Sequence, residues 1–212
     1  MKKHIIVALV LISTAFSGCL VLSLFPIYTK DTLVKLDALE GTWMQRDSSL
    51  WTFAFADTSN PDNLKMYELI VNETYQARKG LDTNIIIPDS LLAEFATSKF
   101  EAGITLINGI YFLDLLADKS ASLSGFHTQH FINGHSISKI TLKDDTLWIS
   151  SLDDDWAKRL KPKERKKYGL LETRKNWILT LQTKPLRDFL AKVAKDTNVF
   201  PEPNTYLIKV KN

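Results

Sequence analysis

The stretch KFEAGITLINGIYFLDLL, residues 99–116, contains the clearest structural signal in the chain. Two largely apolar runs, 99–107 and 110–116, flank the dipeptide Asn108-Gly109. Both turn residues tolerate the positive φ angles that a two-residue hairpin turn requires. We therefore predict an antiparallel β-hairpin at this position.

Short runs on both sides of this hairpin alternate with the two-residue period of a β-strand. The further strand candidates are residues 50–55, 64–72, 84–87, 136–142, 146–152, 176–182 and 206–210. In the first of these, Trp51, Phe53 and Phe55 fall on one face, which we expect to be buried. The turn Lys143-Asp144-Asp145 predicts a second hairpin between 136–142 and 146–152.

The helical signals are fewer and mostly follow residue 152. Residues 153–160 predict a short helix with an aspartate cap, followed by a basic loop over 161–167. A longer helix is expected from Thr183, with Pro185 in its first turn. Its apolar stripe consists of Leu186, Phe189, Leu190 and Val193. A brief helix is also predicted over 89–95.

Nine or ten short strands, with one helix before the final strand, indicate a mainly β protein. This order favours a closed or nearly closed antiparallel β-barrel with a C-terminal helix.

The N-terminus has the three-part layout of a secretory signal peptide. Lys2 and Lys3 precede an apolar run over 5–16, and Ser17 and Gly18 precede Cys19. The stretch Phe16-Ser17-Gly18-Cys19 resembles a lipobox, which implies cleavage before Cys19 and acylation of its thiol. The alternative is an uncleaved anchor, because residues 5–27 are long enough to cross a bilayer as a helix of about 20 residues.

These signals divide the chain into a signal peptide (1–18), a lipidated cysteine with a tether (19–36) and a β-barrel-like domain (37–212). Without residues 1–18, the chain contains 25 basic and 24 acidic side chains. A nearly neutral domain has no electrostatic footprint for nucleic acid, so we expect no nucleic-acid partner. Cys19 is also the only cysteine, which excludes an internal disulfide.

Gly41-Thr42-Trp43, preceded by Leu39, resembles the Gly-x-Trp signature of lipocalins and other calycins. The resemblance implies that Gly41 opens the first barrel strand and that Trp43 closes one end of the barrel beneath a basic residue. Arg174 is the position that best matches this basic residue. Together with the lipobox, the pattern is also similar to a group of bacterial lipoproteins.

Two clusters contain residue types that bind metals, but we predict no metal site. The histidines of the mature chain are His127, His130 and His135. They would need a loop, and a carboxylate such as Asp114, to surround an ion, because odd spacings on a strand alternate between faces. Asp153-Asp154-Asp155 could hold calcium, although carboxylates at a helix start also satisfy free N–H groups.

The sequence also contains a dense basic run, and it lacks the common catalytic motifs. The run consists of Lys158, Arg159, Lys161, Lys163, Arg165, Lys166 and Lys167. It is either a solvated loop or a surface that meets anionic lipid headgroups. We find no nucleophile elbow, zinc-binding helix motif or phosphate-binding loop in the sequence, so we expect no enzymatic activity and no cofactor.

The sequence therefore predicts a lipoprotein of the bacterial cell envelope, held on the membrane through Cys19. Leu20 follows the cysteine where many lipoproteins kept in the inner membrane have an aspartate. By analogy with those lipoproteins, we expect the outer membrane, facing the periplasm, if the organism has one. The domain is expected to bind an apolar ligand or an envelope partner, with Trp51, Phe53, Phe112 and Trp148 as candidate ligand-binding residues. The alternative is a structural or assembly factor with a filled barrel that acts through its surface.

Overall fold

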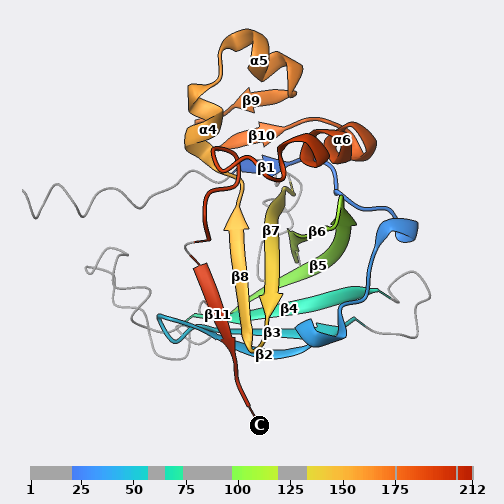
Figure 1. Cartoon of the computed structure of the whole chain (residues 1–212), viewed down its shortest axis with the longest axis vertical. Coiled ribbons are helices and arrows are strands. Elements are labelled where there is room, and N and C mark those ends of the chain that lie inside the picture. The colour runs from blue at the N-terminus through green and yellow to red at the C-terminus, as the bar shows by residue number, and fades with distance from the viewer. Residues whose placement is uncertain are drawn as a thin grey trace, which may run out of the picture.

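The computed structural model of the chain describes residues 21–56, 65–73, 97–118, 133–174, 176–203 and 205–211. Its centre is a closed antiparallel barrel of eight strands (Figure 1). These strands are β2 (Gly41–Gln45), β3 (Leu50–Phe55), β4 (Met66–Asn72), β5 (Thr97–Ile107), β6 (Ile110–Ala117), β7 (His135–Lys143), β8 (Thr146–Ser151) and β11 (Thr205–Lys209). Each pairs with the next, and β11 closes the ring against β2. The prediction of a mainly β, barrel-forming chain is confirmed.

Three further strands extend this sheet beyond the barrel. β1 (Val21–Ser23) pairs antiparallel with the start of β7 and parallel with β10 (Trp177–Leu179), which in turn pairs with β9 (Leu170–Glu172). The helices α4 (Asp154–Arg159), α5 (Pro162–Lys167) and α6 (Thr183–Val193) gather around this extension at one end of the molecule (Figure 1). Everything between β8 and β11 therefore forms a cap beside the barrel.

Two hydrophobic clusters hold these parts together, one inside the barrel and one beneath the helices. Strand β6 contributes to both because successive side chains point to opposite faces. Leu113 faces the barrel cluster, whereas Phe112 packs with Phe200 in the helix cluster. The buried residues Leu186, Phe189 and Leu190 confirm the predicted apolar stripe of α6.

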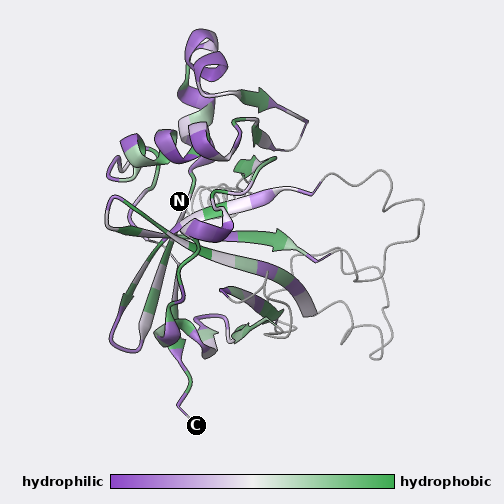
Figure 2. Ribbon diagram, turned by 90° about the vertical axis from the view of Figure 1, so that its right-hand side faces the viewer, coloured by the Kyte–Doolittle hydropathy of each residue, from purple (hydrophilic) through white to green (hydrophobic). Residues whose placement is uncertain are grey.

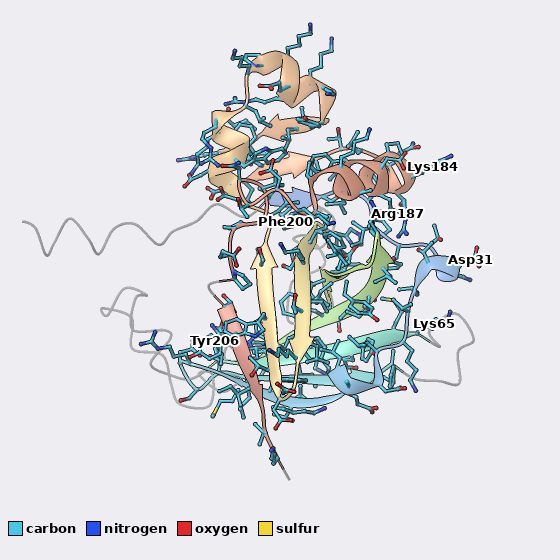
Figure 3. All side chains as sticks on the ribbon, viewed as in Figure 1. Asp31, Lys65, Lys184, Arg187, Phe200 and Tyr206 are labelled. Carbon is cyan, nitrogen blue, oxygen red and sulfur yellow. The ribbon has the colours of Figure 1, made fainter. Side chains whose placement is uncertain are left out.

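The segment before Leu36 differs from the predicted tether. Val21, Ile27 and Leu33 are buried, and Val34 N–H donates a hydrogen bond to Ile104 O. The short 3-10 helices η1 (Lys30–Thr32) and η2 (Asp37–Leu39) complete this segment. Arg187 of α6 also donates a hydrogen bond to Ile27 O (Figure 3). The packed part of the chain therefore already includes Val21 and does not begin near Leu36.

Both predicted hairpins are confirmed, with turns at Asn108-Gly109 and Asp144-Asp145. Asn108 has a φ of 51° and Gly109 one of 78°, as the two-residue turn requires. The helix over 153–160 is confirmed as α4, and the closing strand over 206–210 as β11. The predicted strand over 84–87 and helix over 89–95 lie outside the described residues.

The predicted basic loop over 161–167 is wrong, because these residues form α5. Pro162 occupies the first helical turn, where its missing N–H costs nothing, and Glu164 Oε2 accepts a hydrogen bond from Lys161 N–H. The helix is coloured as hydrophilic at the top of Figure 2. The predicted strand over 176–182 is shorter and belongs to the extension rather than to the barrel.

Candidate functional site

Side chains fill the barrel over the described strands. Trp43, Phe53 and Tyr67 are each no more than 1% exposed, and the ring of Tyr67 packs 6.4 Å from Phe53, centroid to centroid. Smaller fully buried residues in the same cluster are Leu39, Leu69, Ile104, Leu113 and Leu147. The space in which a calycin-like barrel would hold a ligand is thus occupied by the protein's own side chains.

The four candidate ligand-binding residues do not line a common cavity. Trp51 and Phe53 pack in the barrel cluster, whereas Phe112 points to the opposite face of the sheet and joins the helix cluster. Trp148 lies on the outer face of β8, 36% exposed, with its ring 5.2 Å from Tyr206. Only the first two residues therefore face the barrel interior.

Trp51 has one unusual feature inside the barrel. Its Nε1–H is buried and has no hydrogen-bond acceptor among the described residues. A buried donor without a partner costs about 1–3 kcal/mol, so such groups call for an explanation. An acceptor on a bound molecule would provide one.

The Gly-x-Trp residues open the first barrel strand as expected, but the basic partner of Trp43 is not Arg174. The Nζ atom of Lys209, on β11, lies 5.1 Å from the centroid of the Trp43 ring and donates a hydrogen bond of 2.8 Å to Ala38 O. Trp43 Nε1–H donates to Leu39 O. Arg174 lies in the turn between β9 and β10, in the cap. Lys209 is detectable in retrospect, because it shares the inward-facing alternation of Leu207.

Asp114 and His135 form a buried polar pair where β6 meets β7. The distance between Asp114 Oδ1 and His135 Nδ1 is 2.7 Å, and Asp114 Oδ2 accepts a hydrogen bond from Ile27 N–H. Burial, together with the negative charge of Asp114, raises the pKa of Tyr28 well above its usual range. This pair fastens the N-terminal segment to the barrel. His127 and His130 lie outside the described residues.

The three aspartates at 153–155 serve α4. Asp153 caps the helix by accepting hydrogen bonds from Asp155 N–H and Trp156 N–H. Lys158 forms ion pairs with Asp154 and Asp155. Their carboxylate oxygens lie close enough to hold an ion, but the local contacts match the helix-capping interpretation.

The basic run divides into two groups. Lys158, Arg159 and Arg165 are paired within the domain, and Arg165 also lies 4.6 Å from the centroid of the Trp177 ring. The second group consists of Lys161, Lys163, Lys166 and Lys167, all exposed. No ion pair joins these four lysines to an acidic side chain of the described residues. Of the four, Lys167 also places its Nζ atom 5.4 Å from the centroid of the Tyr168 ring.

An open groove of about 290 Å³ lies between α5, the end of β10 and α6. We call it the α5–α6 groove. Its apolar lining comes from Tyr168, Leu181, Pro185, Phe189 and Val193. The charged lining residues are Lys167, Asp188 and Lys192. Sequence reasoning missed this groove because it requires α5, which was predicted as a loop.

The fold belongs to a recognisable class, an eight-stranded antiparallel meander barrel with a Gly-x-Trp opening, consistent with a calycin-like fold. Some barrels of this class bind ligands in their interior or at their mouth. Comparisons with protein-family models, curated proteins and solved structures found no match. Within the described part of the chain, no helix has the length and apolar character needed to span a membrane.

Proposed function

We propose that this chain is a lipid-anchored protein of the bacterial envelope whose domain works through its outer surface. The observation that carries the proposal is the packed barrel interior, in which Trp43, Phe53 and Tyr67 are almost completely buried. A filled barrel favours the surface-acting alternative over a carrier of apolar molecules. The resemblance of residues 16–19 to a lipobox supports the anchor.

Native mass spectrometry of the protein purified from its own host tests both parts. Cleavage and acylation at Cys19 would add the mass of the lipid, and a Cys19→Ser variant would lose that mass. The domain starting at residue 20, which lacks Cys19 and is purified without lipid extraction, is expected to have its polypeptide mass alone. It contains every residue of both hydrophobic clusters. A stoichiometric apolar ligand in this domain would overturn the filled-barrel proposal.

The buried N–H of Trp51 favours a second candidate, a ligand held inside the barrel near this residue. Its acceptor atom would satisfy the unpaired donor. Under this alternative, a Trp51→Phe variant would lose the bound mass that the native protein carries. If neither protein carries a ligand, the second candidate is ruled out.

A further inference from the structure

We propose that the α5–α6 groove and the lysines beside it dock onto an anionic lipid bilayer. We call this surface the cationic face and define it by Lys161, Lys163, Lys166 and Lys167, with Lys192 across the groove. The inference deepens the proposed function, since it names the surface that would meet the membrane to which the lipid holds the protein.

Charge complementarity is the first argument. The four lysines at the α5 end are exposed and have no acidic partner among the described residues. Of the nearby acids, Glu164 accepts a hydrogen bond from Lys161 N–H and Glu172 pairs with Arg165, whereas Asp188 is the one acid among the described residues that line the groove itself. The mature chain has a net charge near zero, so this positive charge is a local concentration. Lysines near a membrane surface are attracted to anionic lipid headgroups.

The floor of the groove is the second argument. Tyr168 and Phe189 lie 5.2 Å apart, and both rings contact Trp156, at 5.8 Å and 5.6 Å. This aromatic stack gives the groove a firm apolar base between Lys167 and Lys192. A bilayer offers the matching chemistry, because phosphate oxygens lie directly above the first acyl carbons. Aromatic side chains are favoured at that boundary.

The third argument is the short distance between the anchor and the cap. Only Leu20 separates Cys19 from β1, and β1 is held between β7 and β10. Two residues span at most about 7 Å, so a lipid on Cys19 would bring the bilayer close to β1. Strand β10 leads into α6, and β9 follows α5 (Figure 1). Strand β1, which follows the anchor, and the cationic face therefore belong to the same structural unit.

Vesicle binding by the domain that starts at residue 20 tests this inference without the lipid. The probes are vesicles of phosphatidylcholine alone and vesicles that also contain about one third phosphatidylglycerol. We expect binding to the anionic vesicles only. A variant with Lys163→Gln, Lys166→Gln and Lys167→Gln should bind at least about tenfold more weakly.

Two matched controls separate the groove from general charge. A variant with Lys65→Gln, Lys99→Gln and Lys143→Gln removes the same charge from exposed positions on the barrel and should retain binding within about threefold. On α6, Lys192→Gln should weaken binding more than Lys184→Gln, because only Lys192 lines the groove. Circular dichroism confirms that each variant is folded.

Equal losses in the two triple variants, or no binding to anionic vesicles, would overturn the docking surface. Equal losses of vesicle binding in Lys192→Gln and Lys184→Gln would show that the groove has no part in the docking. Failure of the proposed function is read separately, from the absence of the acyl mass on the native protein.

Discussion

At the scale of single residues, the contact between Lys209 and Trp43 links the last barrel strand to the first. The ammonium group lies over the indole ring and also donates a hydrogen bond to Ala38 O. The ring belongs to β2 and the carbonyl to the adjacent η2, so one lysine joins β11 to the segment that opens the barrel. This arrangement resembles the one expected from the Gly-x-Trp signature, with a different basic residue.

Replacing Lys209 by methionine should lower the free energy of unfolding by about 1–2 kcal/mol, because it removes a cation–π contact and a charged hydrogen bond. Urea unfolding followed by circular dichroism measures the change. Arg174→Met, in the β9–β10 turn, is the matched control and should change stability by less than about 0.5 kcal/mol. The opposite ranking would restore the role first assigned to Arg174.

Tyr67 links stability to alkaline pH. Burial raises its pKa to about 12, although the hydrogen bond that the phenol oxygen accepts from Leu36 N–H acts in the opposite direction. The unfolded chain releases this proton near pH 10, so the stability that the phenol contributes is fully present below about pH 10 and is lost as the pH rises towards 12.

A Tyr67→Phe variant should be about 1–2 kcal/mol less stable at pH 8, because both backbone groups of Leu36 lose their partner. Urea titrations at pH 8 and pH 11 should show that this difference shrinks at the higher pH. A difference that is constant with pH would contradict the assignment.

The residues that sequence reasoning placed correctly share a local cause. Trp51, Phe53 and Phe55 follow the alternation of one strand, and Asp153 caps the helix that it precedes. Pairings between distant segments have no such local signal. Lys209 over Trp43, and Asp114 beside His135, depend on how strands meet in the closed barrel.

At the scale of elements, the N-terminal segment shows the limit of pattern reading most clearly. Residues 21–23 are too few to display alternation, and they follow an apolar run that resembles a signal peptide. Their strand character comes from partners, since β1 is flanked by β7 and β10. Strand β9 and helix α5 were missed for the same reason, because each is short and depends on the cap around it.

Removing β1 should therefore destabilise the domain. A chain that starts at Pro26 loses the buried side chain of Val21 and both pairings of β1, which we expect to cost about 2 kcal/mol or more. The reference is the chain that starts at Leu20. Urea unfolding of the two proteins gives the difference, and equal stabilities would mean that residues 20–25 behave as a tether after all.

At the scale of the whole molecule, the two hydrophobic clusters share strands. On β6 and β7, Leu113 and Ile140 face the barrel cluster, whereas Phe112 and Ile137 face the helix cluster. Neither cluster can lose its packing without disturbing the strands that support the other. The cap and the barrel should behave as one cooperative unit.

Leu69→Ala in the barrel and Leu190→Ala in α6 should each cost about 2–5 kcal/mol. Each should shift the urea transitions measured by tryptophan fluorescence and by far-ultraviolet circular dichroism by the same amount. Two separate transitions, with each variant affecting only one, would show that the cap unfolds independently.

The position of β1 also has a consequence for the order of events during biosynthesis. Its partners are residues 135–136 of β7 and 177–179 of β10, which the ribosome makes long after Val21. The first strand of the described residues therefore stays unpaired until two much later strands have been made. Any enzyme that modifies Cys19 before then acts on a nascent chain whose neighbouring strand is still free, whereas one that arrives later finds that cysteine two residues from a completed sheet.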